Sequence, residues 1–254
     1  MDITTAFSLE GQQALVTGGG TGIGYGISQA LAAAGARVIV LGRREALLQQ
    51  AVAQLGEGCR YVRYDMDRRE GIPSLIEDIE KKYGAIDILV NNAGVHLKKL
   101  SLETSDEEFD RVLQTNLSSV FTLTRECVRH MKERRSGSVI FISSMTGLFG
   151  MDKVIAYGTS KTALIGMMRV MVMEYSADNI RVNAIAPGWI RSDMLQAALD
   201  ADKERKDKIM GRIPFKDFGS SEDIGLAAVY LSSNAAKYVT GVVLPVDGGA
   251  AYAF

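Results

Sequence analysis

The chain has 254 residues, of which 47% are hydrophobic and 23% are charged, and its formal net charge is −1. A chain of this size and composition can bury one large core, so we expect a single domain over residues 1–254. The near-zero charge gives no reason to expect nucleic acid or an anionic membrane as a partner.

Signals for membranes, export and metals are weak. No apolar stretch has transmembrane length and the start, MDITTAFSLEG, lacks the regions of a signal peptide, so we expect a cytoplasmic protein. Cys59 and Cys127 lie far apart without a CxxC pattern, and neither His96 nor His130 stands among other metal ligands. We therefore expect no disulfide framework and no metal site.

Apolar, β-rich runs alternate with helical patterns along the whole chain. This alternation predicts an α/β fold of the Rossmann type, a doubly wound parallel sheet of about seven strands with helices on both faces. The last run contains Pro245, which cannot donate a ladder hydrogen bond and so favours an edge strand. The expected strands are residues 14–16, 38–41, 61–64, 86–90, 139–142, 182–185 and 242–246.

The first strand is followed by a glycine-rich turn in ALVTGGGTGIG, and a helix is expected over residues 23–34. Gly18, Gly22 and Gly24 let the backbone turn tightly and let a diphosphate approach the helix N-terminus, where free N–H groups favour anions. A turn from strand to helix often needs glycine anyway, so this motif alone leaves a nucleotide site and a plain turn both open.

The second strand ends at Gly42-Arg43-Arg44. An acidic residue at this place commonly binds the ribose hydroxyls of NAD, whereas a basic residue accommodates the additional phosphate of NADP. We therefore predict NADP(H), with Arg43 as the main phosphate contact and Arg44 as a helper. Glu45 is a further side chain that could reach a ribose.

Residues 138–161, SVIFISSMTGLFGMDKVIAYGTSK, combine a buried strand, a glycine-containing loop and the start of a helix. Tyr157 and Lys161 are four residues apart, so both side chains can point from one helix face into one site. A cation about 4 Å from the phenol, at an effective dielectric of about 20, contributes about 4 kcal/mol, enough to lower the phenol pKa by about 2 to 3 units. Ser144 can hydrogen-bond the same substrate oxygen, which predicts proton transfer to a carbonyl.

The order of these motifs resembles that of the classical short-chain dehydrogenase/reductase family over essentially the whole chain. The resemblance implies reversible hydride transfer between a nicotinamide cofactor and a ketone or secondary alcohol. The motifs are TGxxxGxG from Thr17, the sequence NNAG at 91–94, Asn116, Ser144, the YxxxK pair Tyr157 and Lys161, and Pro187-Gly188.

The resemblance also implies a role for each catalytic residue. Tyr157 would be the general acid in reduction and the base in oxidation. Lys161 would lower the Tyr157 pKa and bind the nicotinamide ribose, and Ser144 would polarise the carbonyl. Asn116 would hold a water that links the lysine to solvent; as an amide in an apolar helix it needs such partners, although a local helix kink would also explain it.

The cofactor residues follow from the same resemblance. Asp65 and Met66 would meet the adenine, and Ser192 the nicotinamide carboxamide. Thr21 stands where many NADP-using members carry a second basic residue, so NAD stays an alternative. The full expected set is Gly18, Thr21, Gly22, Ile23, Gly24, Arg43, Arg44, Asp65, Met66, Asn92, Ala93, Gly94, Tyr157, Lys161, Pro187, Gly188, Ile190 and Ser192.

For the substrate, the stretches FSLEG, DRREGIPSLIEDIEKKYG, VHLKKLSLE and RIPF resemble the gluconate and 2-deoxygluconate dehydrogenase branch. This implies a sugar acid, with His96, Lys98, Lys99 and Arg191 as candidate contacts; the two lysines would otherwise be ordinary surface charge. The alternatives are a 3-oxoacyl-acyl-carrier-protein reductase and a non-catalytic protein that senses nucleotides on the same scaffold.

Two further expectations concern the second half of the chain. Residues 190–219 are charged, helical in pattern and bounded by glycine and proline, which predicts a substrate lid. The helix that begins near Tyr157 is apolar on nearly every face, so it should be buried beyond the sheet as well. We therefore expect a homo-oligomer, a tetramer or a dimer.

Overall fold

Seven parallel strands form one sheet in the order β3-β2-β1-β4-β5-β6-β7. The computed structural model describes residues 2–192 and 203–253. The predicted doubly wound sheet is confirmed, with strand ends shifted by a few residues. The strands are β1 (Gln13–Thr17), β2 (Arg37–Gly42), β3 (Arg60–Arg63), β4 (Ile88–Asn91), β5 (Gly137–Ile142), β6 (Ile180–Pro187) and β7 (Val243–Val246).

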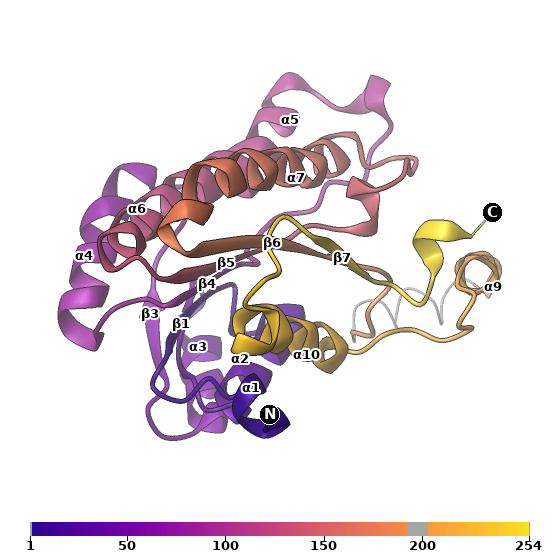
Figure 1. Ribbon diagram of the computed structural model, residues 1–254. Coiled ribbons are helices and arrows are strands. Elements are labelled where there is room, and N and C mark those ends of the chain that lie inside the picture. The colour runs from indigo at the N-terminus through magenta and orange to yellow at the C-terminus, as the bar shows by residue number, and fades with distance from the viewer. Residues whose placement is uncertain (1, 193–202, 254) are drawn as a thin grey trace.

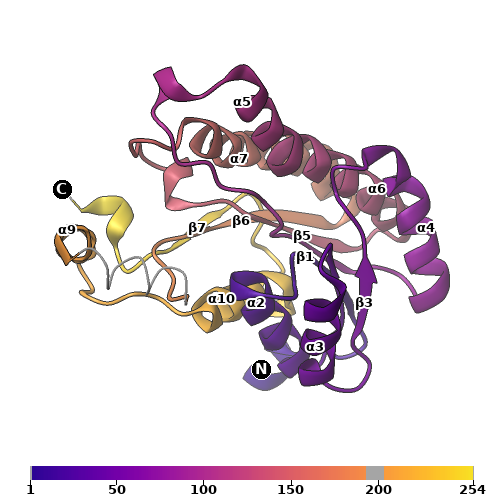
Figure 2. The same ribbon diagram turned by 180° about the vertical axis from the view of Figure 1, so that it is seen from behind.

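Helices cover both faces of this sheet (Figure 1). One layer contains α4, α6 and α7, and the opposite layer contains α2, α3 and α10, as the view from behind also shows (Figure 2). The helices are α1 (Ile3–Phe7), α2 (Gly22–Ala33), α3 (Glu45–Leu55), α4 (Ile72–Tyr83), α5 (Asp106–Leu113), α6 (Ser119–Arg134), α7 (Ile155–Tyr175), α9 (Lys203–Arg212) and α10 (Ser221–Ser232). In the described parts of the chain no helix is both long and apolar enough to cross a membrane.

Side chains alternate along each strand between two buried clusters. Leu15, Ile39 and Phe141 belong to the cluster with residues of α4, α6 and α7. Val16 and Val40 belong to the cluster with residues of α2 and α10. Because both faces are buried, the strands read as continuous apolar runs rather than as alternating ones.

The edge strand β7 pairs with β6 alone, and Pro245 lies opposite Ala186 in that ladder. Proline has no backbone N–H to donate, and an outer strand can accommodate it because no strand on that side needs the missing donor. The predicted edge position is confirmed.

Helices α2 and α10 pack at backbone distance. A Cβ on Gly26 would lie 2.6 Å from the Ser221 carbonyl oxygen, and a Cβ on Gly225 would lie 2.6 Å from the Gly26 carbonyl oxygen. No larger residue fits this contact without moving a helix. The packing fixes α2, whose N-terminus faces the cleft described below.

The chain reverses direction across the sheet between β3 and β4. Strands β2 and β3 extend the sheet on one side of β1, and β4 begins the other half on its opposite side. The connections leaving the carboxyl ends of β1 and β4 therefore diverge and open a crevice, the usual ligand position in such sheets.

Candidate active site

The glycine-rich turn after β1 forms one wall of the crevice. Gly18 and Gly22 have φ values of 65° and 54°, a region that glycine adopts without steric cost. A Cβ on Gly24 would lie 2.2 Å from the Gly18 carbonyl oxygen, so only glycine allows the turn to fold back on α2. The result is a backbone cradle at a helix N-terminus, which fits a dinucleotide diphosphate.

Thr17 connects this turn to the loop after β4. Its hydroxyl accepts hydrogen bonds from the N–H groups of Asn92 and Ala93, both at 2.9 Å. The Asn92 amide donates to the Thr17 carbonyl oxygen at 3.0 Å. The two loops therefore form one rigid wall.

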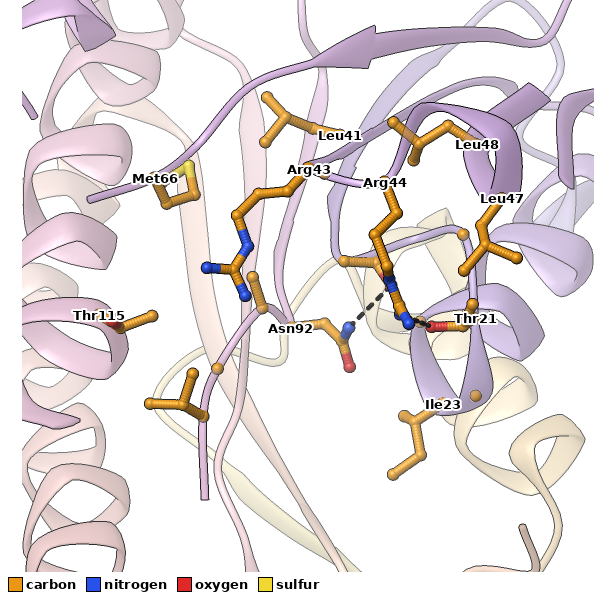
Figure 3. A pocket seen from close by; sticks show the side chains of 18 of the residues that line it. Thr21, Ile23, Leu41, Arg43, Arg44, Leu47, Leu48, Met66, Asn92 and Thr115 are labelled. Atoms are coloured by element: carbon orange, nitrogen blue, oxygen red, sulfur yellow. Dashed lines mark hydrogen bonds between the residues drawn. The ribbon is translucent and has the colours of Figure 1, made fainter. Parts of the chain in front are cut away.

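A cavity of about 450 Å³ lies along this wall (Figure 3). Fourteen of the predicted cofactor residues line it. They come from the glycine turn, the end of β2, the loop after β3, the loop after β4 and the segment after β6. They are Gly18, Thr21, Gly22, Ile23, Gly24, Arg43, Arg44, Asp65, Met66, Asn92, Ala93, Gly94, Ile190 and Ser192.

Arg43 and Arg44 enter the cavity in different directions (Figure 3). Arg44 turns toward the glycine loop, where its guanidinium donates to Thr21 Oγ1 at 3.3 Å, whereas Arg43 extends into the middle of the cavity. Glu45 turns away instead, because its carboxylate pairs with Tyr61 and Arg63 on β3. Within residues 2–192 and 203–253, no carboxylate forms an ion pair with Arg43 or Arg44, so both charges remain available for an anion.

A second cavity of about 230 Å³ adjoins the first and shares Ile23, Asn92, Gly94 and Val95 with it. Ser144, Tyr157, Lys161, Pro187 and Gly188 line this part, together with His96. The structure thus brings the predicted catalytic serine, tyrosine and lysine together at the end of the cofactor cavity.

Burial raises the pKa of Tyr157 above its usual value of 10, and a hydrogen bond with Ser144 opposes this effect. The expected net lowering by Lys161 is not what the structure shows. The ammonium lies 5.6 Å from the centre of the Tyr157 ring and donates to the Ile142 carbonyl oxygen at 2.7 Å. In this arrangement the phenol is a proton donor rather than a phenolate.

Lys161 is itself deeply buried, with 4% of its surface exposed. Burial lowers the pKa of its ammonium to about 8. The lysine therefore holds its proton weakly for an amine. Such a group can pass a proton toward the phenol near neutral pH.

Asn116 lies in a turn that sequence patterning did not resolve. A single helix was expected there, but a π-helical turn (Gln114–Ser118) separates α5 from α6. The Asn116 side chain accepts from the Val95 N–H at 2.7 Å, and donates to the Val95 carbonyl at 2.9 Å and to Ser160 Oγ at 3.1 Å. The π-helical turn is the local distortion that would explain a buried amide here. Asn116 also lies close to the lysine, because a Cβ on Gly94 would touch Asn116 and approach Lys161. A role in holding a water stays a prediction.

His96 packs against Tyr157, with ring centres 4.6 Å apart and ring planes tilted by 47°. Partial burial, and then the charge of Lys98, lower the pKa of this imidazole. His96 is therefore mainly neutral at pH 7, and offers a hydrogen bond rather than a charge to whatever occupies the second cavity.

The other predicted substrate residues lie outside the second cavity. Lys99 donates to Glu108 at 2.6 Å, and its backbone N–H bonds the Lys153 carbonyl at 2.8 Å. Lys98 is exposed near His96, and neither lysine lines the first or the second cavity. Arg191 lines the first cavity and pairs with Asp217.

Comparison with known proteins gives the relatives of this chain. Residues 18–251 match the profile of a family described as enoyl-(acyl carrier protein) reductase. The chain is 43% identical over 247 residues to the 2-dehydro-3-deoxy-D-gluconate 5-dehydrogenase of Bacillus subtilis, covering 96% of each chain. It is 36% identical over 242 residues to the 3-oxoacyl-acyl-carrier-protein reductase of Escherichia coli, covering 95% of this chain and 98% of that one.

The chain belongs to the short-chain dehydrogenase/reductase family. As a member it is an oxidoreductase that acts on alcohol groups. A solved gluconate 5-dehydrogenase of Burkholderia cenocepacia, in complex with NADP and tartrate, superposes with a TM-score of 0.94 at 29% identity, over 100% of both chains. The resemblance read from the motifs is confirmed.

Some residues of the short-chain dehydrogenase/reductase site were missed in the sequence. Thr17 was visible as the first letter of the TGxxxGxG motif, but its bonds to the NNAG loop were not. Tyr64 and Thr115 also line the first cavity, and Ser143 the second. Only the folded chain brings Thr115, from a helix, to the same wall as Tyr64.

The predicted lid, residues 190–219, is described in part. Residues 193–202 lie outside the described residues. Of the remainder, α9 is helical as expected, and Arg212 at its end lies 4.5 Å from the centre of the Phe149 ring, in the loop that follows Ser144. A role as a lid stays a prediction.

The buried amine predicts a specific pH dependence of stability. Between pH 8 and about 10.5 the unfolded chain binds the Lys161 proton and the folded chain does not, so raising the pH favours folding. Relative to a Lys161→Met variant, the wild-type free energy of unfolding should rise by about 2 kcal/mol from pH 8 to pH 10. Urea unfolding of both proteins at pH 8 and pH 10 measures this change in the free energy of unfolding. An equal pH dependence in the two proteins would contradict the lowered pKa of Lys161.

Proposed function

We propose that this protein is an NADP(H)-dependent dehydrogenase/reductase that interconverts a ketone and a secondary alcohol of a small sugar acid, such as gluconate and a keto-gluconate. The observation that carries the reaction type is the meeting of Ser144, Tyr157 and Lys161 at the end of a dinucleotide-sized cavity. The cofactor would supply or accept the hydride.

Basic residues at the end of β2 support NADP over NAD. Gly42 stands where an acid would bind ribose hydroxyls, and the Arg43 and Arg44 charges face the cavity. A hydrogen bond holds Arg44 near Thr21, whereas Arg43 extends further into the cavity. The two guanidinium groups could therefore contact a phosphate from two sides. The Burkholderia relative was solved with NADP. NAD stays an alternative.

The catalytic residues divide the proton chemistry among them. Ser144 and Tyr157 line the second cavity together, and Ser144 would polarise the substrate carbonyl. The raised pKa keeps the phenol protonated, so Tyr157 would donate a proton in reduction. In oxidation it would first release its own proton toward Lys161 and solvent, and then accept the proton of the alcohol. Lys161, buried behind it, would return the proton to Tyr157. Asn116 would hold a water through which Lys161 takes up a proton from solvent.

The charge around the second cavity supports an acidic substrate. Among the described residues that line it there is no aspartate or glutamate, while Lys161 and the polar His96 face it. Lys98 is close enough to lower the His96 pKa, and in the described chain no ion pair neutralises it. We propose Lys98 as the contact to the carboxylate and His96 as a hydrogen-bond partner for a hydroxyl, with Lys99 and Arg191 in the supporting loops.

The relatives of this chain are named for more than one class of substrate. The Bacillus relative is named for a deoxygluconate and the Burkholderia structure holds tartrate, a hydroxy acid. The Escherichia coli relative is named for a 3-oxoacyl thioester, which is the second candidate function. A non-catalytic nucleotide sensor is disfavoured, because the catalytic side chains are all in place.

We also propose a homo-oligomer, in the cytoplasm and most simply a tetramer. Helix α7 exposes Val170 by 58% and Met173 by 84%, and α6, in the same helical layer (Figure 1), exposes Phe121. Such apolar surface on a helical layer is typical of a subunit contact.

Replacing Tyr157 by Phe should lower turnover by at least about a hundredfold, because the proton donor is lost while the ring stays. NADPH affinity, measured by the fluorescence of the bound cofactor, should change less than about twofold, since the contact with His96 is preserved. Substantial residual turnover would refute the proton-transfer role.

Replacing Arg43 by Asp should weaken NADPH binding by about tenfold to a hundredfold, because a charge-assisted hydrogen bond is replaced by repulsion. NADH binding should fall much less, as NADH lacks the additional phosphate. An unchanged ratio of the two affinities would show that Arg43 does not contact that phosphate.

Rates of NADPH oxidation with a keto-gluconate and with a short 3-oxoacyl thioester should be compared side by side. We expect the sugar acid to be reduced faster, and Lys98→Gln to raise its KM about tenfold while Lys99→Gln, whose lysine already pairs with Glu108, changes it little. A faster thioester rate would move the protein to fatty-acid synthesis and return Lys98 to ordinary surface charge.

A further inference from the structure

One side-chain hydrogen bond ties the loop after β3 to the π-helical turn between α5 and α6. Thr115 Oγ1 donates to Asp67 Oδ1 at 2.8 Å. The Asp67 N–H in turn donates to Asp65 Oδ1 at 3.2 Å. Asp65, Met66 and Thr115 line the first cavity, whereas Asp67 stands behind its wall and is exposed to solvent.

The π-helical turn has one side chain directed to each end of the cleft. Thr115 meets the β3 loop, and its neighbour Asn116 holds both polar groups of the Val95 backbone and the hydroxyl of Ser160 on the catalytic helix. The wide turn is closed by Ser119 Oγ, which donates to the Gln114 carbonyl at 2.9 Å. Turns of this kind are rare in helices and are frequent at functional sites.

We propose that the Asp67–Thr115 hydrogen bond is a positioning pair that holds the π-helical turn, and thereby couples dinucleotide binding beside Asp65 and Met66 to the grip of Asn116 on Val95. The bond is exposed in the free protein, so water competes with it. A dinucleotide covering Asp65, Met66 and Thr115 excludes that water and strengthens the bond. The ligand then favours the conformation in which Asn116 is held for proton supply.

This proposal differs from a simple wall function of Thr115. If Thr115 only lines the cavity, then removing Asp67, which is not part of the wall, leaves both the cofactor affinity and Val95 undisturbed. If the pair positions the turn, then loss of either partner weakens the hydrogen bond of the Val95 N–H. Neither residue contacts that N–H directly. The amide exchange rate of Val95 therefore reports the coupling without any substrate.

The experiment uses two matched pairs of variants in the full-length protein. Asp67→Ala removes the acceptor, whereas Asp67→Asn keeps an oxygen in its place; Thr115→Val removes the donor, whereas Thr115→Ser keeps it. We expect Asp67→Ala and Thr115→Val each to speed Val95 amide exchange about threefold to tenfold and to weaken NADPH binding by a similar factor. The Asn and Ser variants should keep the Val95 exchange rate within about twofold of the wild type.

The double variant Asp67→Ala/Thr115→Val gives the second test. Since both changes break the same bond, its effects should be no larger than those of either single variant. Additive effects, an unchanged Val95 amide, or equal losses in the Asn and Ser variants would each overturn the proposal. None of these readouts needs a substrate, so failure of the sugar-acid assignment would leave the test intact.

Discussion

The burial of one amine at the carboxyl edge of the sheet constrains the rest of the site. Lys161 extends from helix α7 toward the end of β5, where it is buried and its ammonium donates to the carbonyl oxygen of Ile142. An ammonium in such a place is costly, which is why its pKa falls to about 8. The fold accepts this cost because α7 is fixed on the sheet by a long apolar face, and the lysine cannot leave without unpacking the helix.

The cofactor cleft depends on close backbone packing rather than on charge. Gly24 touches the Gly18 carbonyl, and behind it Gly26 and Gly225 let α2 and α10 meet without side chains between them. The position of the helix N-terminus is therefore set by the same glycine contacts that stabilise the fold. Charge contributes where Arg43 and Arg44 extend from the end of β2 into the cavity.

Sequence reasoning found the fold and most residues around the cleft, because strand runs, glycine turns and i to i+4 spacing are local properties. It did not find the π-helical turn, since one extra residue in an amphipathic helix barely changes the apolar pattern. It expected Lys161 to lower the Tyr157 pKa, but burial dominates in the fold, and burial cannot be read from the spacing of two residues. Likewise, Glu45 and Lys99 were candidates for ligands, and their partners Tyr61, Arg63 and Glu108 lie on other segments or a later helix.

What the sequence by itself determined is the order of strands and helices, the glycine cradle and the motif residues that we predict to transfer the proton. Each of these depends on neighbours within a few positions, or on motifs whose order is written in the chain. What only the tertiary structure decided is which charges are free and which are paired, how deeply Lys161 is buried, and that Asp67 meets Thr115. These are contacts between segments far apart in the chain, and their energies depend on distance and solvent exclusion, which exist only after the sheet and its two helical layers have packed.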